Sequence, residues 1–455
     1  MSFSYKRKSL FIFLAFLLIL LSGFFLRYES ALETEVVNPL RSDARQYFMY
    51  AYNLRHKNTY SQEVGYPALL ESTVKPDALR TPGYPLFLTP FVDGLPNAGM
   101  MNRILFSQVL LSTFTILLTF LLFQSFLPPL WALGPTLLVA LSPHLIVSNS
   151  YILTETLFCF LLVVLGWLMS LFGKRPSLYL GTVIGAAMGF TALVRPSLQF
   201  FPLILALFLL SFYGWKRGKR YSGVMLVGFA LVFLPWIGRN MATLGTASDN
   251  RLMINFLHHG MYPDFMYEGV PQSRGFPYRY DPRAEKIAED LPSVLKEISS
   301  RFVQAPLRHA KWYLLDKPGA FWSWDIIQGS GDAFVYPVSN SPYFHNTFFR
   351  ITHGLMYVLH YPLLVLALFA CLMAWFPLTR IGLTHESLLI ARFCSLLLVY
   401  YTLIHIIGAP FPRYSVPLRP YLYGMALFTP YILIRSIQKS RGPLPLLPLT
   451  LNVER

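Results

Sequence analysis

The run K-R-K-S-L-F-I-F-L-A-F-L-L-I-L-L-S-G-F-F-L, Lys6–Leu26, places basic residues directly before an apolar stretch long enough to cross a membrane. Its apolar part begins at Leu10 and exceeds the roughly 7–15 residues of a secretory signal core, and no clear small-x-small cleavage site follows. We therefore expect an uncleaved first span whose N-terminus lies in the cytoplasm.

The rest of the chain has the same apolar character. Of its 455 residues, 54% are hydrophobic and 13% are charged, and the mean hydropathy is +0.46, whereas soluble domains carry about 25% charged residues. With only 3 Cys as well, this composition excludes soluble, disordered and disulfide-rich proteins. It predicts an all-α polytopic membrane protein with about ten transmembrane helices. These begin near Leu10, Ile104, Leu130, Ile152, Leu178, Leu198, Gly223, Phe348, Leu388 and Val416.

The net charge of +16 comes from basic residues that lie mostly in short breaks between apolar runs. Membrane topology therefore explains them better than binding to nucleic acid, which we do not expect as a partner. With the N-terminus inside, the short inner segments hold the Lys and Arg residues within 6–8, 174–175, 216–220, 380 and 435–441. The short outer segments hold only Arg195, Arg413 and Arg419. This asymmetry predicts a multi-pass inner (cell) membrane protein with cytoplasmic N- and C-termini.

The same topology divides the chain into three parts. Residues 1–240 form an N-terminal module of seven spans, which includes a first large outer loop, 27–103. Residues 241–347 form a second large outer loop, and residues 348–455 form the C-terminal spans and a cytoplasmic tail. Both large loops are expected on the extracytoplasmic side.

The first outer loop is predicted to contain a helix that starts at Ser42 or Asp43 and lies along the membrane surface. Apolar and aromatic residues then recur at helical spacing: Tyr47, Tyr50, Ala51 and Leu54. Asp43 either caps this helix or belongs to a site, and residue type alone favours the cap.

Two further outer stretches have recognisable patterns. R-T-P-G-Y-P-L-F-L-T-P-F, Arg80–Phe91, is apolar, but its Pro and Gly residues predict irregular backbone that lines a cavity. Residues 282–315 carry apolar side chains at helical spacing with charges between them, followed by the aromatic residues Phe321, Trp322 and Trp324. We expect amphipathic helices there, layered on the outer face.

Three arginines abut the outer ends of spans, where positive charge is disfavoured: Arg195, Arg239 and Arg413. Each one alone could extend to lipid headgroups. Because guanidinium groups hold phosphate bidentately, several of them around one cavity, with Arg41 and Arg45, favour a bound phosphate.

Glu155 lies at the mouth of a predicted span, in N-S-Y-I-L-T-E-T-L-F. Lipid would not tolerate this carboxylate, so it must face a cavity or a partner. It either joins Asp43 in a paired acidic site or forms a structural salt bridge with one of the arginines. The sequence does not rank these alternatives.

In this order and placement, the motifs resemble the GT-C superfamily of polyprenyl-phosphate-dependent membrane glycosyltransferases, near the aminoarabinose transferases of lipid A and the protein O-mannosyltransferases. The resemblance covers most of the chain. It rests on Asp43 with Tyr47 and Ala51 behind it, T-P-G-Y-P-L-F-L (Thr81–Leu88), T-E-T-L-F (Thr154–Phe158), L-V-R-P (Leu193–Pro196), P-W-I-G-R-N (Pro235–Asn240) and P-R-Y-S-V-P (Pro412–Pro417).

The resemblance implies a fold, a set of site residues and a reaction. The fold is a seven-span module with an outer jaw helix, followed by more variable spans. Asp43 and Glu155 would be catalytic carboxylates, and the phosphate of a polyprenyl-phosphate sugar donor would be held by Arg195, Arg239 and Arg413. The substrate cavity would include Arg45, Tyr47, Tyr84 and Tyr414.

The resemblance also implies the chemistry. A sugar would pass, with inversion, to a hydroxyl or phosphate of an envelope lipid, glycan or protein. Many relatives have two adjacent acids where this chain has Ser42-Asp43-Ala44. A tightly bound metal is therefore in doubt, and a divalent metal ion stays an open alternative. The rival interpretations are a lipid-linked sugar transporter or flippase, and a non-catalytic subunit of an envelope assembly complex.

Overall fold

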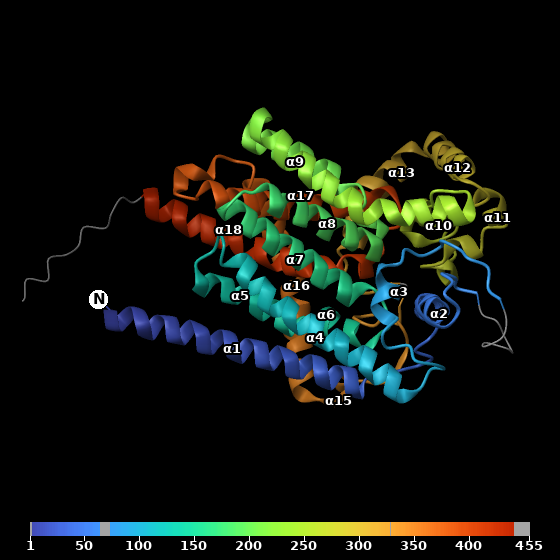
Figure 1. Ribbon diagram of the computed structural model, residues 1–455, viewed down its shortest axis with the longest axis horizontal. Coiled ribbons are helices and arrows are strands. Elements are labelled where there is room, and N and C mark those ends of the chain that lie inside the picture. The colour runs from blue at the N-terminus through green and yellow to red at the C-terminus, as the bar shows by residue number, and fades with distance from the viewer. Residues whose placement is uncertain (1, 64–72, 328, 441–455) are drawn as a thin grey trace, which may run out of the picture.

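A computed structural model describes residues 2–63, 73–327 and 329–440 of the chain. It is almost entirely helical, as predicted. The long helices run side by side, and α2, α3 and α10–α13 gather at the opposite end of the bundle from the N-terminus (Figure 1). Within the described residues, the regular β-structure is one antiparallel pair, β1 (Glu35–Val36) and β2 (Val338–Asn340). The predicted cytoplasmic tail from Arg441 onward lies outside the described residues.

The long helices form a bundle. They are α1 (Ser2–Glu33), α4 (Ala98–Phe123), α5 (Pro129–Leu141), α7 (Glu155–Lys174), α8 (Leu178–Val194), α9 (Phe201–Leu244), α16 (Thr347–Met373), α17 (His385–Ile407) and α18 (Arg419–Ser440). Six helices among the described residues are long and apolar enough to cross a membrane, and a seventh results if α5 and the bent segment after it count as one span. The predicted count of ten spans is therefore not confirmed.

Shorter helices connect the spans and form the outer layer. They are α2 (Ser42–Lys57), α3 (Gly83–Leu88), α6 (Pro143–Val147), α10 (Arg251–Gly260), α11 (Ala284–Ile287), α12 (Leu291–Gln304), α13 (Pro306–Lys311), α14 (Lys317–Phe321) and α15 (Pro342–His345). Helices α11–α13 occupy the stretch that was predicted to be amphipathic.

Helix α9 contains a reversal that explains why its sequence predicts two spans. Gly214 adopts φ 73°, a left-handed conformation that glycine reaches without strain. The Ser222 hydroxyl donates to the Ala206 carbonyl at 2.8 Å, although the two residues are 16 positions apart. The two arms of α9 therefore lie against each other, and the basic residues 216–220 follow directly after the turn.

Arg27 links three helices inside the bundle. The first outer loop was predicted to begin at this residue, but α1 continues to Glu33 and the side chain is fully buried. Its guanidinium donates to Ser112 Oγ (2.7 Å) and to the carbonyls of Val139 (2.9 Å) and Ala140 (3.0 Å). Pro143 has no N–H to offer Val139, so Arg27 satisfies a carbonyl that the bend after α5 would leave without a partner.

Two predictions about the first outer loop need correction. Helix α2 is present, but its aromatic residues are buried in protein contacts instead of facing the membrane; Tyr50, for example, stacks on Tyr60. The stretch after Arg80 is not irregular, because Gly83–Leu88 forms the helix α3. Pro82 precedes this helix and Pro85 lies in its first turn, where no backbone N–H is needed.

We expect replacement of Arg27 by Met to destabilise the bundle. The carbonyls of Val139 and Ala140 would become buried acceptors without donors, at about 1–3 kcal/mol each. Thermal unfolding of the purified protein in detergent would show a lower midpoint than wild type. Arg45→Met, at an exposed position of α2, is the control. An unchanged midpoint for Arg27→Met would contradict this role.

Candidate functional site

Five charged side chains meet at the end of the bundle that carries α2 and α3, which we call the outer end after its predicted side of the membrane. We call these side chains the arginine–carboxylate cluster: Asp43, Arg80, Glu155, Arg195 and Arg413. Arg413 lies at its centre, with Nη2 2.8 Å from Asp43 Oδ2 and Nε 3.2 Å from Glu155 Oε1. Arg80 Nη2 lies 2.7 Å from Asp43 Oδ1, and Arg195 forms an ion pair with Glu155. Glu155 thus forms the salt bridge that one alternative predicted, and the shared Arg413 places it in the same cluster as Asp43.

Helix ends position these side chains. Glu155 occupies the first turn of α7, and Thr154 before it accepts a hydrogen bond from Arg195 Nε at 2.7 Å. Arg195 is the extended residue that ends α8, because Pro196 follows it. Arg413 lies in a short 3₁₀ turn, Pro412–Tyr414, between α17 and α18.

Asp43 does not cap α2. The residue at the helix N-cap is Arg41, and no side chain caps the helix there. The Asp43 carboxylate instead accepts from Arg80 and Arg413. The interpretation of Asp43 as a simple helix cap is therefore wrong.

The cluster carries one more cation than anions, because three guanidinium groups face two carboxylates. Burial raises the pKa of Asp43, but the guanidinium groups of Arg80 and Arg413 outweigh burial and lower it to about 2. Burial lowers the pKa of Arg413, yet the carboxylates of Glu155 and Asp43 raise it well above its ordinary value. Asp43 and Arg413 are therefore both ionised at neutral pH. Glu155 Oε2 is a buried acceptor without a partner.

Aromatic rings surround the cations. The Tyr414 ring lies between two arginines, 5.3 Å from the Arg195 guanidinium carbon and 5.4 Å from that of Arg413. Arg80 lies 5.2 Å from the Tyr47 ring. Of the predicted cavity residues, Tyr47 and Tyr414 thus contact the cluster.

The other two predicted cavity residues lie outside this contact layer. Tyr84 is fully buried behind Tyr47 and donates to Gln108 Oε1 at 2.9 Å, which gives it a packing role. Arg45 is exposed on α2, and the cluster's carboxylates are held by other arginines.

Arg239 also lies apart from the cluster. Its guanidinium donates to the carbonyls of Asp77 (2.8 Å) and Tyr60 (3.2 Å) and stacks near the rings of Trp236 and Tyr60. It lines a separate groove of about 550 Å³ with Leu54, Leu86 and other residues. Its predicted role at the donor phosphate thus lacks the geometry that Arg195 and Arg413 have.

Arg80 belongs to the cluster but was not predicted as a site residue, although the stretch Arg80–Phe91 begins with it. Its Nε donates to Gln46 at 2.8 Å, and its Nη2 holds Asp43. The signal that singled out the other arginines was available, because Arg80 is also a positive charge on the outer side beside an apolar segment.

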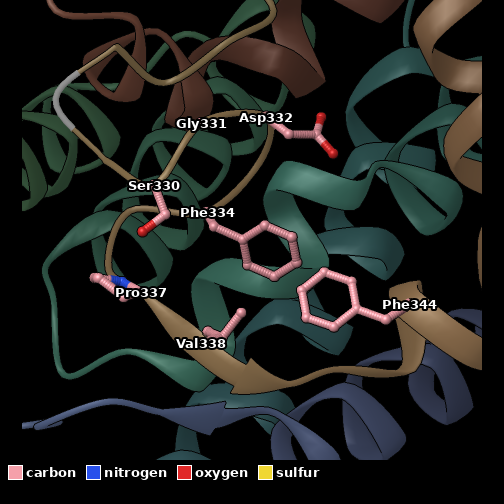
Figure 2. A pocket seen from close by; sticks show the side chains of 7 residues that line it. All are labelled: Ser330, Gly331, Asp332, Phe334, Pro337, Val338 and Phe344. Atoms are coloured by element: carbon pink, nitrogen blue, oxygen red, sulfur yellow. The ribbon is translucent and has the colours of Figure 1, made fainter.

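A second pocket, of about 390 Å³, lies near β2. Figure 2 shows the rings of Phe334 and Phe344 facing each other, with Asp332 at the edge. This carboxylate, the one charged side chain in the lining, is held by His353 (2.6 Å) and Trp324. The arginine–carboxylate cluster is therefore the stronger candidate site.

The cluster does not fit a metal ion. In the part of the chain that the structure describes, no group of three or more His, Cys, Asp or Glu side chains could hold one. Asp43 and Glu155 are each paired with two guanidinium groups. Guanidinium groups thus already lie beside both carboxylates of this site.

Comparison with solved structures establishes the fold. Archaeoglobus fulgidus oligosaccharyltransferase, solved with a tethered acceptor peptide, superposes with TM-score 0.51 and 12% identity over 95% of this chain and 51% of its own. The same enzyme, AglB, in complex with an inhibitory peptide and a dolichol-phosphate gives 0.52 and 13% over 96% and 52%. ArnT from Cupriavidus metallidurans bound to undecaprenyl phosphate gives 0.41 and 14% over 95% and 81%.

The chain shares the fold of the archaeal oligosaccharyltransferase, as the resemblance to the GT-C enzymes implied, and it spans about half the length of that enzyme. Neither protein-family models nor curated proteins give a match.

The lowered pKa of Asp43 predicts how pH changes the effect of its replacement. A carboxyl group with a depressed folded-state pKa stabilises the protein above its unfolded pKa of about 3.9, and this contribution is lost as pH falls towards the folded value. We expect Asp43→Asn to lower the unfolding midpoint at pH 7 and the difference from wild type to shrink below about pH 4. Thermal scans of both proteins across this range would test it, and a difference that stays constant to pH 3 would contradict the ion pairing.

Proposed function

We propose that this protein is a membrane glycosyltransferase that moves a sugar from a polyprenyl-phosphate donor to a hydroxyl or phosphate of an envelope acceptor at the extracytoplasmic face. The observation that carries the proposal is Arg413, which contacts both Asp43 and Glu155 within a cationic cluster at the outer end of the bundle. The GT-C fold supports it, because the archaeal enzyme with this fold was solved with dolichol-phosphate bound.

The arginines suit the phosphate of the donor. When the bond between sugar and phosphate breaks, the leaving group is a phosphate monoester, whose second pKa is near 6, so it needs no general acid. It needs positive charge that is already in place, and Arg80, Arg195 and Arg413 provide it within a buried, aromatic-walled site.

Asp43 suits the acceptor. Its carboxylate is ionised and can accept the proton of an acceptor hydroxyl, or orient that hydroxyl towards the anomeric carbon of the sugar. While both guanidinium groups hold it, Asp43 is a weak base, with a pKa of about 2. A donor phosphate that attracts Arg80 and Arg413 would weaken these ion pairs and make the carboxylate more basic. One direct displacement would then invert the anomeric centre, for a hexose or a pentose alike.

The proposed location of the site limits which donor can reach it. Nucleotide sugars of the cytoplasm do not reach an outer site, so the donor must be a sugar already carried across on lipid. We propose an inner-membrane protein with cytoplasmic termini, which places the cluster on the side where envelope lipids, glycans and proteins are accessible.

Replacement of Asp43 by Asn should remove most of the turnover. The change deletes the charge and the basicity but little volume, and loss of a positioned base typically lowers the rate about 10²–10⁴-fold. The assay uses purified protein in liposomes with a polyprenyl-phosphate sugar, and undecaprenyl phosphate binding serves as the folding control. Normal turnover by a folded Asp43→Asn protein would contradict the role. A flippase would instead bind the lipid without forming any glycoside.

Replacement of Arg413 by Ala should weaken use of the donor at least about tenfold, because hydrogen bonds to charged groups contribute about 1.5–3 kcal/mol each. Arg413→Lys should recover only part of the loss, since an ammonium keeps the charge but lacks the planar fork. Arg239→Ala is the matched control, because that arginine lies outside the cluster. An equal loss in both alanine variants, or transfer from a nucleotide sugar alone, would contradict the proposal.

A further inference from the structure

The second outer loop exposes a row of large apolar side chains, which we call the outer apolar row: Val303, Leu307, Leu314 and Leu315. Val303 is 82% exposed and Leu307 is 86% exposed, the two highest values for large apolar side chains in the described part of the chain. Leu314 and Leu315 are 69% and 68% exposed. Val303 lies near the end of α12, Leu307 lies in α13, and Leu314 and Leu315 lie in the π-helical turn that follows, Trp312–Asp316.

Water is an unfavourable environment for this row. Each Å² of apolar surface left in water forgoes roughly 25 cal/mol of transfer free energy, and contiguous exposed apolar patches mark contact surfaces. The lipid-facing helices offer a comparison, since the most exposed large apolar residue of α16, Val358, is 70% exposed. Val303 and Leu307 are thus more exposed than any large apolar side chain of α16.

The structure joins this segment to the outer end of a span. Lys317 Nζ donates to the carbonyls of Ile406 (2.8 Å) and Gly408 (2.9 Å), where α17 ends. Trp322 Nε1 donates to Thr402 Oγ1 at 3.1 Å, one turn deeper along α17. Leu314 and Leu315 lie three and two residues before Lys317, so this part of the chain lies close to the end of α17.

The surfaces on both sides of this junction both expose large apolar side chains. On α17, Leu403 and Ile407 are 55% and 60% exposed, as expected for side chains that face lipid. On the outer segment, Arg308 and Lys311 are exposed close to the row in the sequence, and Lys311 pairs with Asp316 at 2.9 Å. Cations next to apolar side chains match the phosphates and acyl chains of a bilayer surface.

We infer that α12, α13 and the turn after them lie in the outer leaflet of the membrane, with the outer apolar row in contact with phospholipid acyl chains. Figure 1 shows α12 and α13 at the same end of the bundle as α2 and α3. Trp312, in this turn, packs with Phe265, Ala409 and Phe411. The lipid-bound segment therefore supports the loop that carries Arg413 and sets its depth at the membrane surface.

A fluorescence experiment on the full chain tests this inference without any substrate. The three native cysteines are buried, so an environment-sensitive thiol-reactive fluorophore can label one introduced cysteine in turn: Val303→Cys, Leu307→Cys or Leu314→Cys. The proteins are placed in phospholipid nanodiscs with and without nitroxide groups on the acyl chains. Leu403→Cys on α17 is the lipid-facing reference, and Glu285→Cys, exposed on α11, is the aqueous control.

The expected result is blue-shifted emission and nitroxide quenching at all three row positions, comparable to Leu403→Cys, with neither effect at Glu285→Cys. Emission typical of water and no quenching at Val303→Cys and Leu307→Cys would overturn the inference. Blue-shifted emission without quenching would overturn it as well, because another protein surface, or a second copy of the chain, would then cover the row.

Discussion

The contact of one guanidinium group, that of Arg413, with the carboxylates of both Asp43 and Glu155 is the interaction on which the outer end of this molecule depends. A charge beside hydrocarbon is tolerated only when it is paired or faces water. Glu155 begins a span, and its carboxylate is 3% exposed, so it requires the two arginines that hold it. Those arginines fix the loop after α8 and the turn before α18, and Asp43 adds α2.

The same ion pairs hold the cluster together and make it suited to an anion. With three cations and two anions, the cluster has one excess positive charge. A bound anion would interact with this excess positive charge, and every arginine would still have an anionic partner. A phosphate would compete with Asp43 for Arg413 and Arg80, so donor binding and the release of a reactive carboxylate would be coupled by charge alone. Under the proposed function, such an arrangement would favour reaction only when the lipid phosphate is present.

The sequence was sufficient for the membrane character and for most of the cluster. Hydropathy locates the helices, and a charge on the disfavoured side of the membrane singled out Arg195 and Arg413, while lipid's exclusion of carboxylates singled out Glu155. The same criterion also singled out Arg239, but this side chain stacks near the rings of Trp236 and Tyr60, outside the cluster. The criterion also applies to Arg80, but Arg80 lies in a stretch from which only the backbone structure was predicted. The partner of each charge is a long-range contact that no local pattern contains. Asp43 and Arg413, which pair although they are 370 positions apart in the sequence, illustrate this.

The most direct measurement of the central claim is a cryo-electron microscopy structure of the full chain in nanodiscs with undecaprenyl phosphate. The account predicts that the phosphate lies within hydrogen-bonding distance of Arg413 and of Arg80 or Arg195, and that Asp43 no longer pairs with both Arg80 and Arg413. A phosphate bound beside Arg239, with both ion pairs of Asp43 unchanged, would contradict it.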